Sequence, residues 1–187
     1  MPRPCLRCLV LPLVLGLAAG CGAGGSRPAP ADPDGAIAST MTLSSPALGA
    51  AGTIPTAYTC DGTGIPPPLA WSGTPAGAAE LAVTVIDPDA PGGAFIHWVL
   101  LGLPPTALGI PEGGPAPAGA HAATASSGRA GYEPPCPPRG QRHRYRFSVF
   151  ALRRPDRLGP GVAASQALAV IRATAEARGV LIATYGR

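Results

Sequence analysis

Apolar positions in the chain form several short runs that favour β-strands over helices. Residues 81–86 and 95–101 are compact apolar segments rich in Val, Ile and Leu. Residues 144–149 alternate between polar and apolar, as expected for a strand with one buried face. Residues 180–185 form a further strand candidate, and many Pro and Gly turns lie between these runs. The pattern predicts a mainly β domain.

One segment near the C-terminus has helical character. Ser165 could cap it, residues 167–178 could propagate it, and Gly179 could end it. Residues 104–130 show no strong period, and a loop of this length is usually functional or mobile. We therefore expect long loops in the β domain and one helix late in the chain.

The N-terminus resembles a bacterial lipoprotein signal. Two arginines, Arg3 and Arg7, precede an apolar run at 8–19, which is the length of a signal-peptide core and short for a membrane span. The run leads into Ala18-Ala19-Gly20-Cys21, which is similar to a lipobox. We predict a signal peptide at 1–20 and lipidation of Cys21. The alternative is ordinary signal cleavage near Ala19, with Cys21 uninvolved.

The segment after Cys21 predicts a tether. Residues 21–38 are dominated by Gly, Ala, Pro and Asp, which offer little to bury, so we expect a flexible linker followed by one domain at 39–187. The chain would then be exported and anchored through lipid to the outer face of the cytoplasmic membrane or to the outer membrane.

The net charge of the chain excludes few classes of function. The formal charge of +4 becomes +2 once Arg3 and Arg7 are removed with the signal peptide. Residues 139–157 contain seven arginines, but neither interleaved aromatic residues nor a recognition motif accompanies them. We interpret these arginines as part of a solvent-exposed face, and we expect no nucleic-acid partner.

Two cysteines remain in the mature domain. Cys5 and Cys8 leave with the signal peptide and Cys21 would carry lipid, so Cys60 and Cys136 are left as an even pair in an oxidising compartment. The sequence permits either a disulfide between them or two free, partly buried thiols.

The first candidate for chemistry is the turn Asp87-Pro88-Asp89-Ala90-Pro91. Its two prolines fix backbone angles at the end of a strand, so two carboxylates are held on a stiff turn. The alternative is a purely structural turn in which the aspartates accept backbone N–H bonds.

Two histidines and a tyrosine complete the candidate set. His97 lies near the start of an apolar strand, where a core histidine is the alternative. His143 and Tyr145 are two residues apart in a strand and can share one face, next to a proline-rich run. Imidazole, phenol and backbone donors suit a phosphate or carboxylate. A nearby aspartate could orient an imidazole through one nitrogen and leave the other toward the ligand.

Four blocks occur in order along residues 41–187: Tyr58-Thr59-Cys60-Asp61-Gly62, Asp87-Pro88-Asp89-Ala90-Pro91, His97-Trp98-Val99 and His143-Arg144-Tyr145. Taken together, they resemble the phosphatidylethanolamine-binding protein family, in its bacterial Raf-kinase-inhibitor-like branch. The resemblance implies a β-sandwich of two antiparallel sheets with a small shared pocket.

By this resemblance the pocket binds phosphate-like anions, including a phospholipid head group. We expect Asp87 and His97 to form a hydrogen-bonded floor and His143 and Tyr145 a wall, with backbone donors around Pro135 to Pro138. The ligand-binding residues implied are Asp87, Asp89, Pro91, His97, Pro135, His143 and Tyr145.

The chain departs from the family pattern at two places. Pro134 stands where relatives usually have Gly, and proline lacks an N–H and cannot adopt a positive φ. Residues 125–128 read Ala-Ser-Ser-Gly where an Asn-Asp pair is common. Lower ligand affinity, a reshaped loop or a vestigial pocket would follow if those groups contact the anion.

The resulting hypothesis is a membrane-anchored extracytoplasmic binding protein with a regulatory role, which needs no cofactor or metal. Its partner would be a phosphate-like small molecule or a phospholipid head group. A protein partner outside the membrane is also compatible with this hypothesis. One alternative is an inhibitor of an exported protease. Another is a hydrolase that uses the Asp and His side chains as acid and base or as metal ligands, although G-x-S-x-G, H-E-x-x-H and P-loop motifs are missing.

Overall fold

The computed structural model describes residues 1, 32–48, 52–114 and 116–187. The predicted signal peptide, Cys21 and the first part of the predicted linker lie outside the described residues. In chain order the elements are β1 (Thr42–Ser44), a 3-10 turn η1 (Thr56–Tyr58), β2 (Leu69–Ser72), β3 (Glu80–Asp87), β4 (Phe95–Leu103), β5 (Gly109–Ile110), β6 (His121–Ala122), β7 (Arg142–Leu152), α1 (Ala164–Thr174) and β8 (Ala175–Gly186).

The strands form two antiparallel sheets, as predicted. One has the order β1-β2-β5 and the other has the order β6-β4-β3-β7-β8. The longest pairing joins β7 to β8, with His143 opposite Tyr185 and Leu152 opposite Ala175. Apolar side chains between the two sheets, among them Leu81, Val83 and Phe147, form the main core. The β-sandwich fold class is therefore confirmed.

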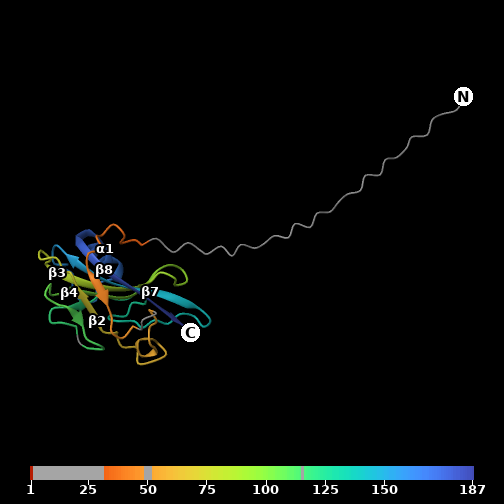
Figure 1. The fold of residues 1–187 in the computed structure, drawn as a ribbon, viewed down its shortest axis with the longest axis horizontal. Coiled ribbons are helices and arrows are strands. Elements are labelled where there is room, and N and C mark those ends of the chain that lie inside the picture. Colours follow the sequence, from red (N-terminus) through yellow and green to blue (C-terminus); the bar gives the residue numbers. More distant parts are fainter. Residues whose placement is uncertain (2–31, 49–51, 115) are drawn as a thin grey trace.

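The helix α1 lies on the other face of the five-stranded sheet (Figure 1). A second apolar cluster is buried between the helix and this face. Alternation along the strands explains the division, because Val83 and Val85 point into the sandwich whereas Ala82 and Ile86 point toward the helix. Within the described residues, no helix is long and apolar enough to cross a membrane.

The predicted helix is wrong at both ends. It begins at Ala164 after the N-cap Ala163, with no side-chain cap, and it ends at Thr174. The chain then enters β8, which pairs with β7, so tertiary pairing overrides the helical propensity of residues 175–178. Gly179 does not end the helix. It lies within β8, where a Cβ atom would come within 2.9 Å of the Met41 carbonyl oxygen.

The long region at 104–130 contains two short strands that the sequence did not reveal. β5 pairs with β2, and β6 pairs with β4. Both strands have only two residues, so their pattern is too short to predict from periodicity.

The end of the predicted flexible linker lies against the domain. Asp34 is buried and accepts hydrogen bonds from Arg172 Nε at 2.7 Å and Arg146 Nη2 at 3.2 Å. Asp32 pairs with Arg146 and Arg178, each at 2.5 Å. In Figure 1 this segment, at the orange start of the coloured chain, lies near α1 and β8. The ordered unit therefore begins before residue 39, because two aspartates meet an arginine cluster.

Candidate functional site

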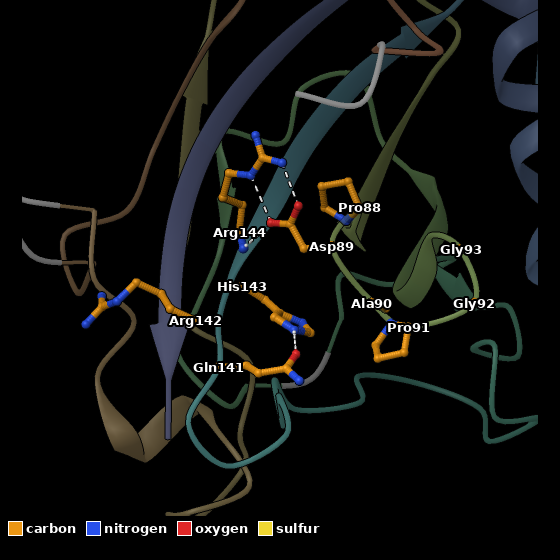
Figure 2. A pocket seen from close by; sticks show the side chains of 10 residues that line it. All are labelled: Pro88, Asp89, Ala90, Pro91, Gly92, Gly93, Gln141, Arg142, His143 and Arg144. Carbon is orange, nitrogen blue, oxygen red and sulfur yellow. Dashed lines mark hydrogen bonds and ion pairs between the residues drawn. The ribbon is translucent and has the colours of Figure 1, made fainter. Parts of the chain in front are cut away.

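The turn after β3 presents its two aspartates to opposite faces of β7. Asp87 Oδ2 lies 2.7 Å from His143 Nδ1, and both side chains are buried. Asp89 accepts hydrogen bonds from the Arg144 backbone N–H at 2.9 Å and from its Nε at 2.8 Å (Figure 2). Since neighbouring residues of a strand point to opposite faces, His143 and Arg144 each meet one carboxylate. Pro88 between the aspartates stiffens this connection.

His97 enters the site through an irregularity in β4. Val85 pairs with Trp98 and Ile86 pairs with Ile96, so His97 is the extra residue of a β-bulge. Its Nδ1 lies 2.9 Å from the Glu133 carbonyl oxygen, and the Glu133 N–H donates to the His97 carbonyl at 2.9 Å. A carbonyl only accepts, so Nδ1 carries the proton and Nε2 is the second nitrogen of this side chain.

The proline-rich loop is held from its other side by the segment around Cys60. The Cys60 N–H donates to the Pro135 carbonyl at 3.1 Å. Cys60 and Cys136 form a disulfide with their Cα atoms 5.4 Å apart. Within residues 134–138 only Cys136 has a backbone N–H, so the donors available from this stretch are few.

These elements enclose a cavity of about 300 Å³. Five of the seven predicted residues line it, whereas Asp89 and Pro135 do not. Asp89 is directed to Arg144 instead, and Pro135 is buried with its carbonyl bound to Cys60. The lining consists of Asp87, Ala90, Pro91, Phe95, His97, Glu133, Pro134, Cys136, Pro137, Pro138, His143 and Tyr145.

The residues predicted to form the floor and the wall of the pocket have partly different partners in the structure. Asp87 is bonded to His143, whereas His97 is bonded to the Glu133 main chain. His97 packs edge-on against Tyr145 with ring centroids 5.3 Å apart. The register of β7 against β3 decides this, because it places His143 beside the end of β3 while the bulge turns His97 toward the loop.

Burial controls the electrostatics of the cavity. Desolvation lowers the pKa of His97 below its usual 6.5, which favours the neutral ring at pH 7. Burial and the nearby charge of Asp87 raise the pKa of Tyr145, so its hydroxyl remains a donor. Outside the cavity, the hydrogen bond from Arg144 holds the pKa of Asp89 below its ordinary value. The cavity thus offers a protonated phenol and two imidazoles.

The Tyr145 hydroxyl is the unusual group of the site. Tyr145 is fully buried at 0% exposure. Among the described residues its Oη finds no hydrogen-bond partner. Buried hydroxyls are normally bonded, so an unpaired one in a cavity lining calls for a partner from outside the chain.

Several supporting residues were missed from the sequence. Gln141 Oε1 lies 3.0 Å from His143 Nε2, so it covers the nitrogen that Asp87 leaves free (Figure 2). Ser127 donates a hydrogen bond to the Glu133 carboxylate. Ser126 Oγ accepts from the Ile96 N–H at 2.8 Å, next to His97. The serines of 125–128, expected from the sequence only as a departure from the family pattern, therefore brace the site through Ile96 and Glu133.

Pro134, the first of the two expected departures from the family pattern, lines the cavity. Its ring packs on Gly64, where a Cβ atom would lie 3.2 Å from Pro134 Cγ. Gly64 has a φ of +68°, a conformation that glycine tolerates without strain. The proline is thus accommodated by the loop after Cys60.

A wider polar groove of about 700 Å³ adjoins the cavity (Figure 2). Ala90, Pro91 and His143 line both spaces, so the His143 ring stands between them. Within the described parts of the chain, no group of three or more His, Cys, Asp or Glu side chains is arranged to hold a metal ion.

A two-sheet β-sandwich with a small cavity at the end of its central strand, lined by histidines, a tyrosine and prolines, defines a class of binding domain. Residues 44–186 match the family model described as phosphatidylethanolamine-binding protein. The chain therefore belongs to the phosphatidylethanolamine-binding protein family.

Curated relatives agree with this assignment. A Mycobacterium tuberculosis protein named "Putative lipoprotein LppC" is 40% identical over 188 residues, which cover 94% of this chain and 92% of the relative. A UPF0098 protein of Methanothermobacter thermautotrophicus is 39% identical over 151 residues, with 79% and 99% coverage. Neither name states a catalytic activity.

Solved structures share the fold. The Chlamydia trachomatis homologue CT736 superposes with a TM-score of 0.73 at 35% identity, covering 80% of this chain and 99% of its own. Escherichia coli YbcL, described as a member of the mammalian family, gives a TM-score of 0.75 at 28% identity with the same coverage.

Proposed function

We propose that this chain is a membrane-anchored extracytoplasmic binding protein whose cavity takes a small phosphate-like anion or a phospholipid head group. The observation that carries the proposal is the fully buried Tyr145 hydroxyl, which lines the cavity without a hydrogen-bond partner among the described residues. A bound oxyanion would accept its hydrogen bond, and buried donors gain most from a charged acceptor.

The acidic groups of the cavity are compatible with an anion because they are already engaged. Asp87 Oδ2 lies 2.7 Å from His143 Nδ1, so this carboxylate is engaged by the ring rather than directed at a ligand. The Glu133 carboxylate accepts a hydrogen bond from Ser127. Both carboxylates therefore have partners within the chain, which reduces their repulsion of an anion.

The membrane location rests on two independent supports. Ala18-Ala19-Gly20-Cys21 resembles a lipobox behind a signal-peptide core. A relative that is 40% identical along nearly the whole chain is named a lipoprotein. We therefore propose export followed by lipid attachment at Cys21.

Binding, rather than catalysis, is the activity proposed for this cavity. Its lining includes no serine or threonine, and the sulfur of Cys136 is bonded to Cys60. A covalent mechanism that uses a serine, threonine or cysteine nucleophile would need such a side chain within reach of His143. The Tyr145 hydroxyl also lines the cavity, but burial raises its pKa and disfavours the phenolate that would act as a nucleophile. A hydrolase screen with phosphate and carboxylate esters is expected to give no turnover.

The test is a titration of the mature chain with phosphate, phosphoethanolamine and acetate, followed through the His97 and His143 ring resonances. Saturable shifts at both rings are expected for the two phosphates. Tyr145→Phe should weaken phosphate binding about ten- to a hundredfold, because one hydrogen bond to a charged group is lost. Tyr58→Phe is the matched control, since Tyr58 donates to Glu112 at 2.9 Å and does not line the cavity.

The outcomes separate the ligand classes. Equal binding of phosphate and phosphoethanolamine would assign recognition to the phosphate alone, whereas tighter binding of phosphoethanolamine would indicate the complete head group. Flat titrations at millimolar ligand, or equal losses in Tyr145→Phe and Tyr58→Phe, would contradict the proposal.

A further inference from the structure

A third hollow, of about 680 Å³, lies on the outer face of the five-stranded sheet and shares no lining residue with the proposed anion cavity. Its floor is apolar and includes Ile96 of β4 together with Val180 and Ile182 of β8, and Leu168 of α1 forms one wall. Ile182 is 56% exposed, one of few large apolar side chains in the described chain with such exposure. We call this hollow the outer groove.

The outer groove exists because α1 is too short to cover the whole sheet. The helix ends at Thr174, and its buried residues pack over one part of the face. The uncovered part of β8 therefore exposes Val180 and Ile182 beside the helix. A volume of this size lies within the range of small-molecule sites.

Arginines surround the apolar floor. Arg144, Arg146 and Arg172 all line the groove. Arg146 Nε is buried and has no hydrogen-bond partner among the described residues. Arg172 is 39% exposed, and its Nε is bonded to Asp34. These guanidinium groups offer further donors to an anion at the edge of the groove.

The charged side chains near the groove carry a net charge of +1. The four arginines of this region are Arg144, Arg146, Arg172 and Arg178, and they are paired with the three aspartates Asp32, Asp34 and Asp89. A ligand with an apolar body and a single negative charge would complement this arrangement, whereas a cation would be repelled.

The groove also lies where the predicted tether meets the domain. Asp32 lines it, and Cys21 is eleven positions upstream in the sequence. Eleven residues span at most about 40 Å. If Cys21 carries lipid, the outer groove is held close to a membrane surface, where single-chain amphiphiles are available.

We propose that the outer groove binds one acyl chain of a monoanionic amphiphile, a fatty-acid carboxylate, with the chain on Ile96, Val180 and Ile182 and the carboxylate at the arginines. The site is independent of the proposed anion cavity, because Arg144 and His143 lie on opposite faces of β7. Either site can fail without the other.

The test uses the mature chain beginning at position 21 with Cys21→Ser, so that it carries no lipid of its own. Laurate is titrated below its micelle concentration and followed by calorimetry and by methyl NMR. We expect saturable binding with shifts at Ile96, Val180 and Ile182. Fatty acids of increasing length should bind about two- to fourfold more tightly per added methylene until the groove is full.

Matched variants identify the site. Ile182→Glu should weaken laurate binding at least tenfold, because it places a like charge on the floor. Leu108→Glu is the control, since Leu108 is 72% exposed and does not line the groove. Tyr145→Phe should leave laurate affinity unchanged. Dodecyltrimethylammonium, with the same chain and the opposite charge, should bind at least tenfold more weakly than laurate.

Three results would overturn the proposal. One is the absence of saturable laurate binding to the Cys21→Ser chain. The second is equal affinity for laurate and dodecyltrimethylammonium, or equal loss in Ile182→Glu and Leu108→Glu, which would indicate nonspecific adsorption. The third is concentration-dependent dimerisation, measured by sedimentation, that Ile182→Glu abolishes, because the groove would then be covered by a second copy of the chain.

Discussion

Strand β3 has a buried carboxylate at each end, and the two differ in the partners that they meet. Asp87, at the C-terminal end, lies beside the imidazole of His143. Glu80, at the other end, accepts from the Gly102 N–H at 3.1 Å and the Asp156 N–H at 3.2 Å, next to the carboxyl of Asp156. One carboxylate can pair its charge, whereas the other must share its site with a second acid.

The consequence is a division of roles along one strand. Burial and the neighbouring Asp156 raise the pKa of Glu80 from 4.5 to about 7. Asp87 is bonded to His143 at the edge of the cavity, whereas Glu80 lies beside a second acid and its raised pKa favours the protonated form. The same type of side chain therefore holds an imidazole at one end of the strand and makes a pH-dependent structural contact at the other.

The largest loss of stability should come from removing the disulfide that holds the proline-rich loop beside Asp87. The Cys60–Cys136 bond closes a separation of 76 residues, and losing a native bridge typically costs about 2–5 kcal/mol. The double variant Cys60→Ala/Cys136→Ala should lose stability in chemical denaturation and bind phosphate more weakly. Unchanged phosphate affinity in the folded variant would show that hydrogen bonds alone hold the proline-rich loop.

Exchanging each carboxylate for its amide sharpens the contrast between the two ends. Asp87→Asn leaves His143 without a charged partner in a buried site and should lower the unfolding free energy by about 2–4 kcal/mol at pH 7. Glu80→Gln resembles the protonated acid and should change it by less than about 1 kcal/mol. Equal losses in denaturant titrations would contradict the difference that we infer from the partners of the two carboxylates.

The smallest effect is the pH dependence of the Glu80 end. Its folded pKa of about 7 exceeds the reference value of 4.5, so the folded chain holds this proton more tightly than the unfolded chain does. The stabilisation is present below about pH 4.5 and is lost as pH rises through about 7. Glu80→Gln lacks this titration. The free energy of unfolding of this variant, compared with that of the wild type, should therefore rise by about 1–3 kcal/mol as the pH increases from 5 to 8.

His121 requires a control, because its Nε2 lies 3.5 Å from Asp156 Oδ1. Denaturation of His121→Gln across the same pH range separates the two groups. A pH dependence that survives in Glu80→Gln and vanishes in His121→Gln would assign the titration to the histidine.

The sequence predicted the broad fold correctly, because alternation and short apolar runs are local properties of strands. The segments at 81–86, 95–101 and 144–149 all lie in strands. Prediction failed at residues 175–178, where a locally helical sequence becomes part of β8. Pairing with β7 is a long-range contact that no local pattern contains.

The sequence by itself determined which chemical groups are available: two histidines, a tyrosine, the stiff Asp87-Pro88-Asp89 turn and an even pair of cysteines. Only the tertiary structure decided their partners. The register of β7 against β3 places His143 within hydrogen-bond distance of Asp87, and the bulge in β4 directs His97 toward the Glu133 carbonyl. The outer groove likewise depends on where α1 ends over the sheet, because its residues come from segments far apart in the chain.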